Sequence, residues 1–481
     1  MSPPSGDECT IGVDVGTTSV KAVAVDGEGR VVARTRVAHT VGTPSAEMLE
    51  HDVSRAWRRG PRKAFAAVSE ALDGPAAGVV VTSMVPSITA VDRRFSPLLP
   101  GLLYGDARAA EMAETAEMAE TADTDGGDLA DLDRRQSAER YQGQRMLAWA
   151  VHERPGARGY WNCQATATHA LSGVPAVDQA TATSFGELYA GGRWDPEAIG
   201  ALGVEEKQLP VVGGMGEGLG TVPGSPTVFA GGSIDAFCEQ IVAGANQPGD
   251  VLVIFGATLI VWVVAEEWRD VPGLTTLPNI MAGQVMIGGP SNAGALFADW
   301  ARTMTGGSSR PKVSDNGVES DEPLRPGDPY RVPVWLPYLR GERTPFHDPT
   351  LRSSLHGLDI AQGPDSMVRA AHEASGFVVR RIIDRSGFGA KRIVATGGGS
   401  RSLPWMQAVA DATGLPVDTV AVSEGAALGA AFLARMAAGR ETSFDAADGW
   451  SRAGRRIEPD PRWTAAADLR FQQFLALSPP G

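Results

Sequence analysis

The sequence has little cysteine, no excess of positive charge and no long apolar run. Its 481 residues include only 3 cysteines, Cys9, Cys163 and Cys238, which lie far apart and without metal-ligand spacing. We therefore expect no disulfide framework and a reducing compartment. The chain has 43 basic and 57 acidic residues and a formal net charge of −14. This balance excludes proteins that bind nucleic acid through a basic face.

The sequence also lacks a membrane-spanning segment. The longest apolar run, Val251 to Ala265, contains Gly256 and Thr258 and is shorter than the roughly 20 residues that a membrane helix needs. The segment MSPPSGDECT has no basic start and no apolar core, so we expect no secretory signal. We expect a cytoplasmic protein whose partners are small molecules, with neither a membrane nor a nucleic acid among them, and consider a homodimer as its assembly.

The remaining composition is that of a packed α/β protein with more than one domain. Apolar residues make up 43% and charged residues 21% of the chain, which is an ordinary globular mixture. Short β-rich runs separated by turns predict an antiparallel meander from Thr10 to Val37. After a turn-rich boundary at Gly244–Asp250, VLVIFGATLIVWVV repeats the order strand, turn, strand. The two halves are therefore expected to begin with related units.

Further along, helices and strands alternate. A helix is predicted over residues 365–386, a strand over 392–396, and a second helix between Pro404 and Gly414. A last helix begins near Ser423, and the chain after about residue 440 is interpreted as an irregular tail with a short helix. The duplicated hexapeptide AEMAET at residues 110–121 predicts a solvated acidic helix, with an acidic docking site as the alternative.

Three segments combine residues suited to chemistry. In Asp14–Ser19, turn amides and hydroxyls can surround phosphate oxygens, and Asp14 is suited to hold Mg²⁺. In Thr396–Ser400, three glycines can bring a ligand onto bare backbone near a helix N-terminus. In Gly231–Asp235, a carboxylate follows two glycines and can take a proton from a hydroxyl. A polar hairpin, an ordinary strand-to-helix turn and a helix-capping aspartate, respectively, would explain the same residues.

Taken together, the ordered motifs resemble those of the FGGY carbohydrate kinases, and most closely the xylulokinase-like members. The resemblance covers residues 10–436 and rests on these motifs in family order: DVGTTSVK, YGDAR, DQATATSFGELY, LPVV, GGSIDAFCEQIVAG, FGAT, PYLRGERTP, GGGSRSLPWMQAVADATGLPV and SEGAALGAAFLA. It implies an α/β fold class, with two actin-like (ribonuclease-H-like) domains around a central cleft. It also implies transfer of the γ-phosphoryl group of ATP, with Mg²⁺, to a hydroxyl of a sugar or polyol.

On this resemblance the expected domains are residues 8–244, with the sugar side and the catalytic base, and residues 248–436, with the nucleotide side; residues 437–481 form the tail. Asp235 matches the catalytic base, and Asp14 with Asp235 the metal-side carboxylates. The remaining residues carried over are the ATP-binding set Thr17, Thr18, Ser19, Lys21, Gly256, Ala257, Thr258, Gly397, Gly398 and Ser402, and the substrate-binding set Met84, Val85, Asp106 and Asp235.

Two segments depart from the family pattern, one that would contact phosphate and one that would contact the sugar. The second phosphate loop has Gly256-Ala257-Thr258 where Gly-Thr-Ser is usual, and residues 83–87 read Ser-Met-Val-Pro-Ser where xylulokinases have Gln-Met-His-Gly. A pentulose such as xylulose is the first hypothesis for the acceptor, within the broader class of ketoses and polyols. The alternatives are an actin-like ATPase switch without a sugar substrate and a catalytically weakened sugar sensor.

Overall fold

The computed structural model describes residues 4–45, 48–104, 106–109, 142–279, 283–306, 328–422 and 424–479. The duplicated hexapeptide at 110–121 and the predicted helix start at Ser423 lie outside these ranges. The described residues divide into two compact units. The first contains those up to Val242 together with Glu424–Trp450, and the second contains the others.

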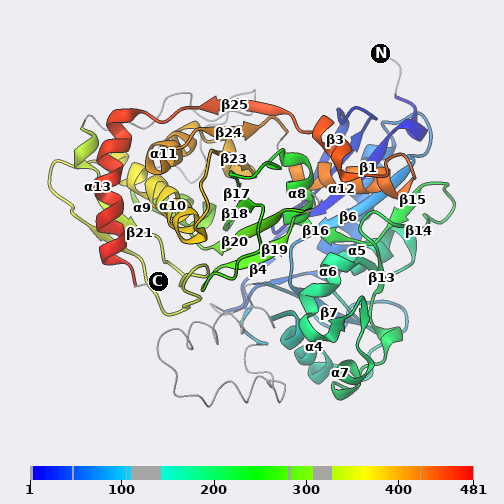
Figure 1. The fold of residues 1–481 in the computed structure, drawn as a ribbon. Coiled ribbons are helices and arrows are strands. Elements are labelled where there is room, and N and C mark those ends of the chain that lie inside the picture. Colours follow the sequence, from blue (N-terminus) through cyan, green and yellow to red (C-terminus); the bar gives the residue numbers. More distant parts are fainter. Residues whose placement is uncertain are drawn as a thin grey trace. The chain divides into compact units, whose positions relative to one another are not determined.

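The first unit is built on a seven-stranded sheet with the order β14-β15-β6-β1-β2-β3, in which β16 also pairs with β6 (Figure 1). Its strands are β1 (Thr10–Val15), β2 (Ser19–Val25), β3 (Val31–Ala38), β6 (Gly78–Ser83), β14 (Gly218–Thr221), β15 (Val228–Ala230) and β16 (Ser233–Ile234). The first three strands are antiparallel neighbours. This confirms the predicted meander.

Strand β1 is buried along its whole length because both faces of the sheet are covered. Ile11, Val13 and Val15 share a core with Trp57 and the helix α1 (Gly60–Ser69). The opposite face packs on α12 (Gly425–Ala437), so closely that a Cβ on Gly12 would overlap the Ala427 carbonyl. This contact assigns α12 to the first unit, whereas the sequence-based boundaries placed it in the second domain.

The first unit also contains a second sheet with the order β4-β5-β8-β7-β9 and its own apolar core around Tyr160, Trp161 and Phe185. Its strands are β4 (Val41–Gly42), β5 (Glu50–His51), β7 (Ser87–Val91), β8 (Gly101–Leu103) and β9 (Gly159–Trp161). The unit's remaining strands and helices are η1 (Gly6–Glu8), η2 (Ser54–Arg59), α4 (Gln142–Glu153), α5 (Cys163–Ser172), β10 (Ala176–Asp178), α6 (Gln179–Ala182), η3 (Thr183–Leu188), β11 (Tyr189–Ala190), β12 (Arg193–Trp194), α7 (Pro196–Ala201), η4 (Glu206–Gln208), β13 (Val211–Gly213), α8 (Asp235–Ala243) and η7 (Phe444–Gly449).

The second unit repeats the arrangement of the main sheet of the first. Its sheet has the order β19-β20-β18-β17-β23-β24-β25. Strand β17 is antiparallel to β18 and parallel to β23, as β1 is antiparallel to β2 and parallel to β6. The strands are β17 (Asp250–Phe255), β18 (Leu259–Ala265), β19 (Thr275–Pro278), β20 (Val285–Ser291), β23 (Arg392–Thr396), β24 (Val417–Val420) and β25 (Ala453–Ile457). The expectation that the two halves begin with related units is confirmed.

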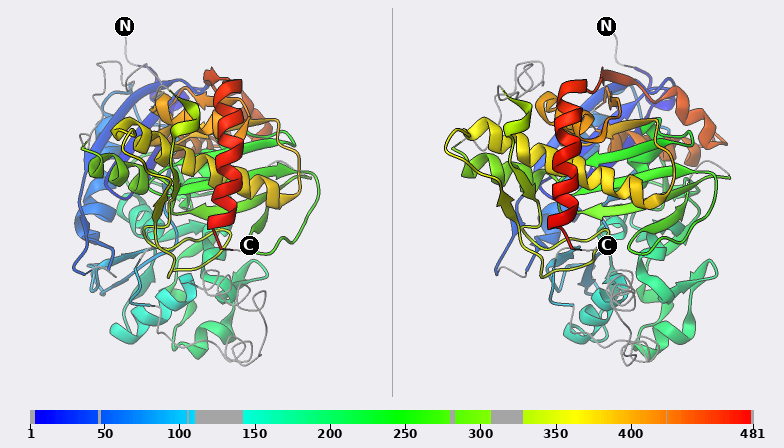
Figure 2. Two further views of the ribbon diagram at one scale, coloured as in Figure 1. Left: turned by 90° about the vertical axis from the view of Figure 1, so that its left-hand side faces the viewer. Right: turned by 60° about the vertical axis from the view of Figure 1, so that its left-hand side comes forward.

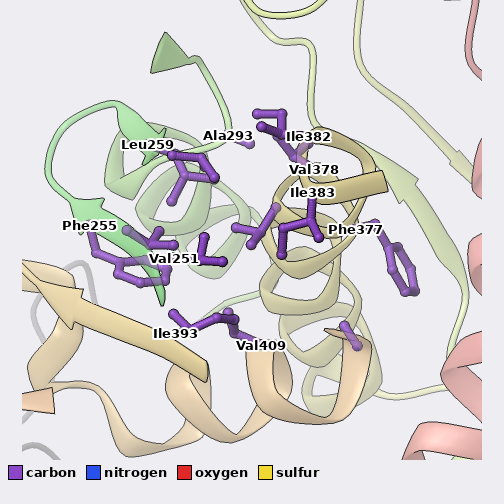
Figure 3. Close-up of a cluster of buried hydrophobic side chains, with 14 of the residues drawn as sticks. Val251, Phe255, Leu259, Ala293, Phe377, Val378, Ile382, Ile383, Ile393 and Val409 are labelled. Carbon is purple, nitrogen blue, oxygen red and sulfur yellow. The ribbon is translucent and has the colours of Figure 1, made fainter. Parts of the chain in front are cut away.

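An apolar core joins this sheet to its helices, with Val251, Phe255 and Ile393 facing Ile382 and Val409 (Figure 3). The helices and short strands of the unit are α9 (Ala295–Met304), η5 (Pro329–Arg331), β21 (Val334–Leu336), β22 (Ser354–His356), α10 (Pro364–Ser386), η6 (Gly398–Arg401), α11 (Leu403–Thr413) and α13 (Pro461–Leu477). The observed bounds of α10, β23 and α11 agree with the predicted elements. Left-handed glycines end both helices, Gly387 after α10 and Gly414 after α11.

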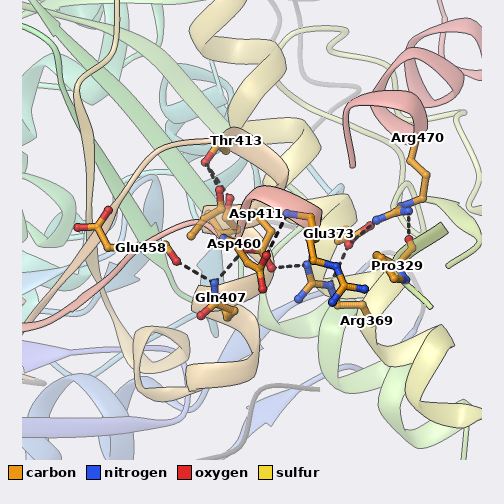
Figure 4. A network of polar contacts seen from close by, with 12 residues as sticks. Pro329, Arg369, Glu373, Gln407, Asp411, Thr413, Glu458, Asp460 and Arg470 are labelled. Atoms are coloured by element: carbon orange, nitrogen blue, oxygen red, sulfur yellow. Dashed lines mark hydrogen bonds and ion pairs between the residues drawn. The ribbon is translucent and has the colours of Figure 1, made fainter. Parts of the chain in front are cut away.

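The interpretation of the C-terminal residues as an irregular tail with a short helix is correct in its terminal helix and wrong in the rest, because these residues are packed into the fold. Strand β25 pairs with β24, and the 17-residue helix α13 packs against α10 and α11 (Figure 2). A buried ion network fixes α13: Arg470 donates hydrogen bonds to Glu373 on α10 and to the Pro329 carbonyl (Figure 4). Arg369 joins Glu373 to Asp411 on α11. The C-terminal helix is therefore part of the second unit's core.

Candidate active site

Three parallel strands of the first unit end at one edge, and two candidate catalytic carboxylates lie there. Asp14 on β1 is level with Thr82 on β6, and Thr82 is level with Ser233 on β16. Asp235 follows β16 directly and is the first residue of α8. The carboxyl ends of parallel strands are where α/β proteins commonly place their ligands. The register thus brings Asp14 and Asp235, 221 positions apart in the sequence, to the same edge.

The charge of Asp14 affects the protonation of Asp235. Burial, with the charges of Asp14 and Glu239, raises the pKa of Asp235 to about 7 against the opposing effects of the Ala236 amide and Lys21. Burial also raises the pKa of Asp14, against the effect of Lys21, whose Nζ lies 3.7 Å from Asp14 Oδ2. Asp235 Oδ1 accepts a hydrogen bond from the Ala236 amide at 2.8 Å. The edge therefore holds two carboxylates with one lysine, and Asp235 has the proton affinity of a base that works near neutral pH.

These groups fit a magnesium ion that is bound largely by water and phosphate. Across the described ranges, no cluster of three or more His, Cys, Asp or Glu side chains could hold a metal ion on its own. Mg²⁺ in phosphoryl-transfer sites commonly uses one or two carboxylates, keeps several waters and takes its other oxygens from the substrate phosphates. Two desolvated carboxylates, one of which raises the pKa of the other, are the kind of donor set that a cation stabilises.

The loop that supports Asp235 is held by backbone contacts. Thr82 Oγ1 donates to the Ser233 carbonyl at 3.1 Å, and Thr181 Oγ1 donates to the Gly232 carbonyl at 3.0 Å. Gly231 has to be glycine because a Cβ there would overlap the Val177 carbonyl. A Cβ on Gly232 would press on the Gln164 side chain, so both glycines before the base serve close packing.

Carbonyl groups of the turn between β1 and β2 accept hydrogen bonds from backbone amides. The Ser19 carbonyl accepts from the Gly16 amide at 3.1 Å, and the Thr18 carbonyl accepts from the His39 amide at 3.0 Å. Thr17 is half-buried, Thr18 is exposed and the Ser19 side chain is buried. Of the predicted phosphate-binding hydroxyls, that of Thr18 is therefore the most accessible, and the Ser19 side chain faces the interior.

The predicted substrate-binding residues fall into two different environments. Met84 is buried in the core of the main sheet, and Val85 after it is half-buried. The Gln164 side chain holds this segment by donating to the Ser83 carbonyl at 2.8 Å. Val85 is therefore better placed than Met84 to meet a ligand.

Asp106 is engaged within the protein. Its carboxylate accepts hydrogen bonds from the Leu49 amide at 2.8 Å and from the Arg108 guanidinium at 2.6 to 3.1 Å. Arg108 also contacts Glu50 at 2.6 Å and is more exposed than Asp106. An acceptor that reached this cluster would meet Arg108 before Asp106.

Residues that sequence reasoning missed surround these predicted ones. Besides Arg108 and Glu50, they include His51, whose Nε2 lies 2.8 Å from the Thr17 carbonyl, and Trp57, which donates to His51 Nδ1 at 2.9 Å. YGDAR contains Arg108 and could have signalled a salt bridge. No local pattern connects His51 with a turn 34 positions earlier.

In the second unit the candidate nucleotide residues also gather at one edge. Ile254 and Thr396 are level on the parallel strands β17 and β23, so the turns that follow them, 256–258 and 397–399, are neighbours. Gly397 has φ +84°, and a Cβ there would press on Phe255. The Ala295 amide at the start of α9 donates to the Gly256 carbonyl at 2.9 Å. This edge presents bare backbone and the Thr258 hydroxyl.

Gly398 and Ser402 differ in their surroundings. Gly398 is exposed, and a Cβ there would meet only Arg401 at 3.9 Å, so packing does not require glycine. Ser402 is buried and precedes α11. An open position that is nevertheless glycine leaves room for a ligand.

Two units with related sheets, each with candidate ligand-binding turns at one sheet edge, make this a two-domain α/β protein. The models of the FGGY family of carbohydrate kinases match this chain, the N-terminal domain over residues 9–232 and the C-terminal domain over residues 252–438. The chain therefore belongs to the FGGY family of carbohydrate kinases and is a phosphotransferase that uses ATP and a sugar.

Individual relatives differ in their acceptors. A gluconokinase from Bacillus subtilis is 25% identical over 477 residues, which cover 91% of this chain and 89% of the relative. A xylulose kinase from Escherichia coli is 26% identical over 476 residues, which cover 90% and 91%. The crystal structure of a xylulose kinase from Rhodospirillum rubrum shares the fold with a TM-score of 0.74, at 23% identity and over 98% of each chain.

In the described part of this chain, no helix is both long and apolar enough to cross a bilayer.

Proposed function

We propose that this FGGY kinase transfers the γ-phosphoryl group of Mg-ATP to a hydroxyl group of a ketose or polyol, with a pentulose such as xylulose as the first acceptor to test. The observation that carries the proposal is Asp235, a carboxylate at the strand edge with a pKa raised by burial to about 7. A sugar hydroxyl has a pKa far above 7, so a base must take its proton as the new oxygen–phosphorus bond forms. The related gluconokinase and xylulose kinase support the kinase class and leave the acceptor open.

In this proposal each candidate residue has a stated task, and Asp235 has two. Asp235 takes the proton of the attacking hydroxyl. Asp14 and Asp235 would hold Mg²⁺, which neutralises charge on the transferred phosphoryl group when it is bound. The amides of the turn after β1 and Lys21 bind phosphate oxygens, as do Gly256, Ala257 and Thr258. Gly397, Gly398 and Ser402 border the adenosine. Val85 borders the acceptor, together with Arg108 and its partners Asp106 and Glu50.

A coupled assay of ADP release over ketopentoses, ketohexoses, polyols and aldonates tests the proposal. We expect ADP release that depends on one class of acceptor. Release at the same rate without any acceptor would instead support the ATPase switch. Acceptor binding measured by calorimetry, without turnover, would support the sugar sensor. The altered segments 83–87 and 256–258 are the reason to consider the sugar sensor.

The location and the assembly belong to the same proposal. All three cysteines are free and buried, and we propose a cytoplasmic location because such thiols suit a reducing compartment. A homodimer stays a prediction, and light scattering of the purified chain tests it.

A further inference from the structure

A buried histidine lies under the candidate phosphate turn of the first unit. His51, on β5, has no exposed surface. Its Nε2 lies 2.8 Å from the Thr17 carbonyl oxygen, and its Nδ1 lies 2.9 Å from Trp57 Nε1. An indole N–H can only donate, so Nδ1 of His51 must accept. The ring proton is therefore on Nε2, which donates to the Thr17 carbonyl.

This hydrogen bond fixes the orientation of one peptide group. In a trans peptide the carbonyl and the following N–H point in opposite directions. Because the Thr17 carbonyl points at His51, the Thr18 N–H points away from it. Thr18 is the exposed residue of the turn. If this peptide rotated, it would present an oxygen instead of an N–H on that side, and an oxygen repels an anion.

The strand that carries His51 is itself firmly held. Glu50 and His51 are successive strand residues, so their side chains point to opposite faces. Glu50 accepts from Arg108 at 2.6 Å, and β5 pairs with both β4 and β8. The His39 ring packs edge-on against the His51 ring, with centroids 4.6 Å apart. The donor nitrogen of His51 therefore has a fixed position.

We propose that His51 is a positioning residue for phosphoryl transfer, which holds the Thr17–Thr18 peptide so that the Thr18 N–H faces the phosphate groups of ATP. The inference rests on the proposed function, in which the turn Gly16–Ser19 binds phosphate. His51 acts through the peptide and does not touch the substrate. Trp57 assists by fixing the tautomer in which His51 can donate.

Replacement of His51 by leucine and by glutamine separates the hydrogen bond from the packing. Leucine fills the site without a donor, whereas the glutamine amide offers an N–H at a reach close to that of Nε2. Without His51 the Thr18 N–H would lose its hydrogen bond to a phosphate oxygen. Hydrogen bonds to charged groups contribute about 1.5–3 kcal/mol, so we expect His51→Leu to raise KM for Mg-ATP by about 10- to 100-fold. The KM for the acceptor should change little, and His51→Gln should restore most of the loss.

Adenosine, which has no phosphate, is the control ligand. We expect its affinity, measured by calorimetry, to be equal in the wild type and both variants. If adenosine and Mg-ATP weaken together, or if glutamine is no better than leucine, the positioning role is refuted. Should the leucine variant fail to fold, His51→Asn replaces it in the same comparison, because its shorter side chain presents an amide that does not reach Thr17.

A second variant separates the failure of this inference from that of the proposed function. Lys21→Met removes the cation on β2 beside this turn and leaves the residues that contact His51 in place. If it leaves KM for Mg-ATP unchanged, the phosphate-binding role of the turn is wrong, and the inference is refuted with it. If Lys21→Met raises KM while the His51 variants behave as the wild type, the inference alone is refuted.

Discussion

Replacement of Asp235 by asparagine should lower activity and raise the stability of the ligand-free protein. The asparagine keeps the shape of the side chain, and its oxygen can still accept the hydrogen bond that the Ala236 amide donates at 2.8 Å. It removes the base, so we expect kcat to fall by about 10²–10⁴. It also removes a charge that burial and Asp14 disfavour, which is why the pKa of Asp235 is raised to about 7.

The stability gain follows from the pKa difference between the folded and unfolded states. The usual pKa of 3.8 rises to about 7 on folding, and each pKa unit corresponds to about 1.4 kcal/mol. The folded state thus holds a proton that the unfolded state releases, and the aspartate's contribution to the free energy of unfolding is lost as pH rises from about 4 through 7. The advantage of the asparagine variant should be absent below pH 4, about 2 kcal/mol at pH 5 and up to about 4 kcal/mol at pH 8.

Thermal unfolding at pH 5 and pH 8, without Mg²⁺ and ATP, measures this gain. For a unit of this size each kcal/mol moves the midpoint by about 2–4 °C, so the variant should melt several degrees above the wild type at pH 8 and less far above it at pH 5. A variant that melts with or below the wild type at pH 8 would refute the argument that Asp235 is desolvated in the folded state. A variant that keeps more than about a tenth of the wild-type kcat would show that Asp235 is not the base.

Three further predictions concern the nucleotide, the core and the acceptor. Gly398→Val should fold, because the position is open, and it should raise KM for ATP. Gly389→Ala, also at an open position, is the control. If Gly398→Val leaves KM for ATP unchanged, the glycine turn is purely structural. Glu373→Gln should cost about 3–5 kcal/mol of unfolding free energy, because it leaves buried arginines without their carboxylate. Asp468→Ala breaks a half-exposed pair with Arg380 and should cost at most about 1 kcal/mol of unfolding free energy. If Glu373→Gln and Asp468→Ala lose the same amount, the buried ion pairs are no more important to stability than the exposed one. Turnover of D-xylulose should be weak because, in our proposal, Val85 borders the acceptor at the position where xylulokinases have histidine. A KM below about a millimolar with high kcat would contradict this prediction.

The sequence predicts much of this fold because its local patterns are strong. The meander from Thr10, the helix α10 and the elements β23 and α11 have clear periodicity and glycine or proline at their ends. The predicted site residues lie in turns that follow strands, and the same turn patterns make them recognisable in the sequence. Parallel pairing then brings Asp14 and Asp235 to one edge.

Two errors have different physical causes. The helix α13 had a readable signal, because its buried Trp463, Ala467, Phe471 and Phe474 follow helical spacing. Arg470 interrupts this apolar face, and only the fold shows that Glu373 on α10 compensates its charge. The assignment of α12 to the first unit had no such signal, since it depends on contact with β1 more than 400 positions earlier. The same kind of distant contact conceals the role of His51.

The two units share the pairing of their first hairpin but differ in charge there. In the first unit Asp14 pairs with Lys21 across the first hairpin, and in the second unit the corresponding pair is Ile254 with Ile260. Both Asp14 and Ile254 stand level with a threonine on the parallel neighbouring strand. The second unit therefore offers backbone and small side chains where the first offers a carboxylate and an ammonium group. Phosphoryl transfer needs the charges, whereas adenosine carries none. In the proposed function, the uncharged pair at this ladder position suits the second unit to border the nucleoside, and the charged pair of the first unit suits the transfer of the phosphoryl group.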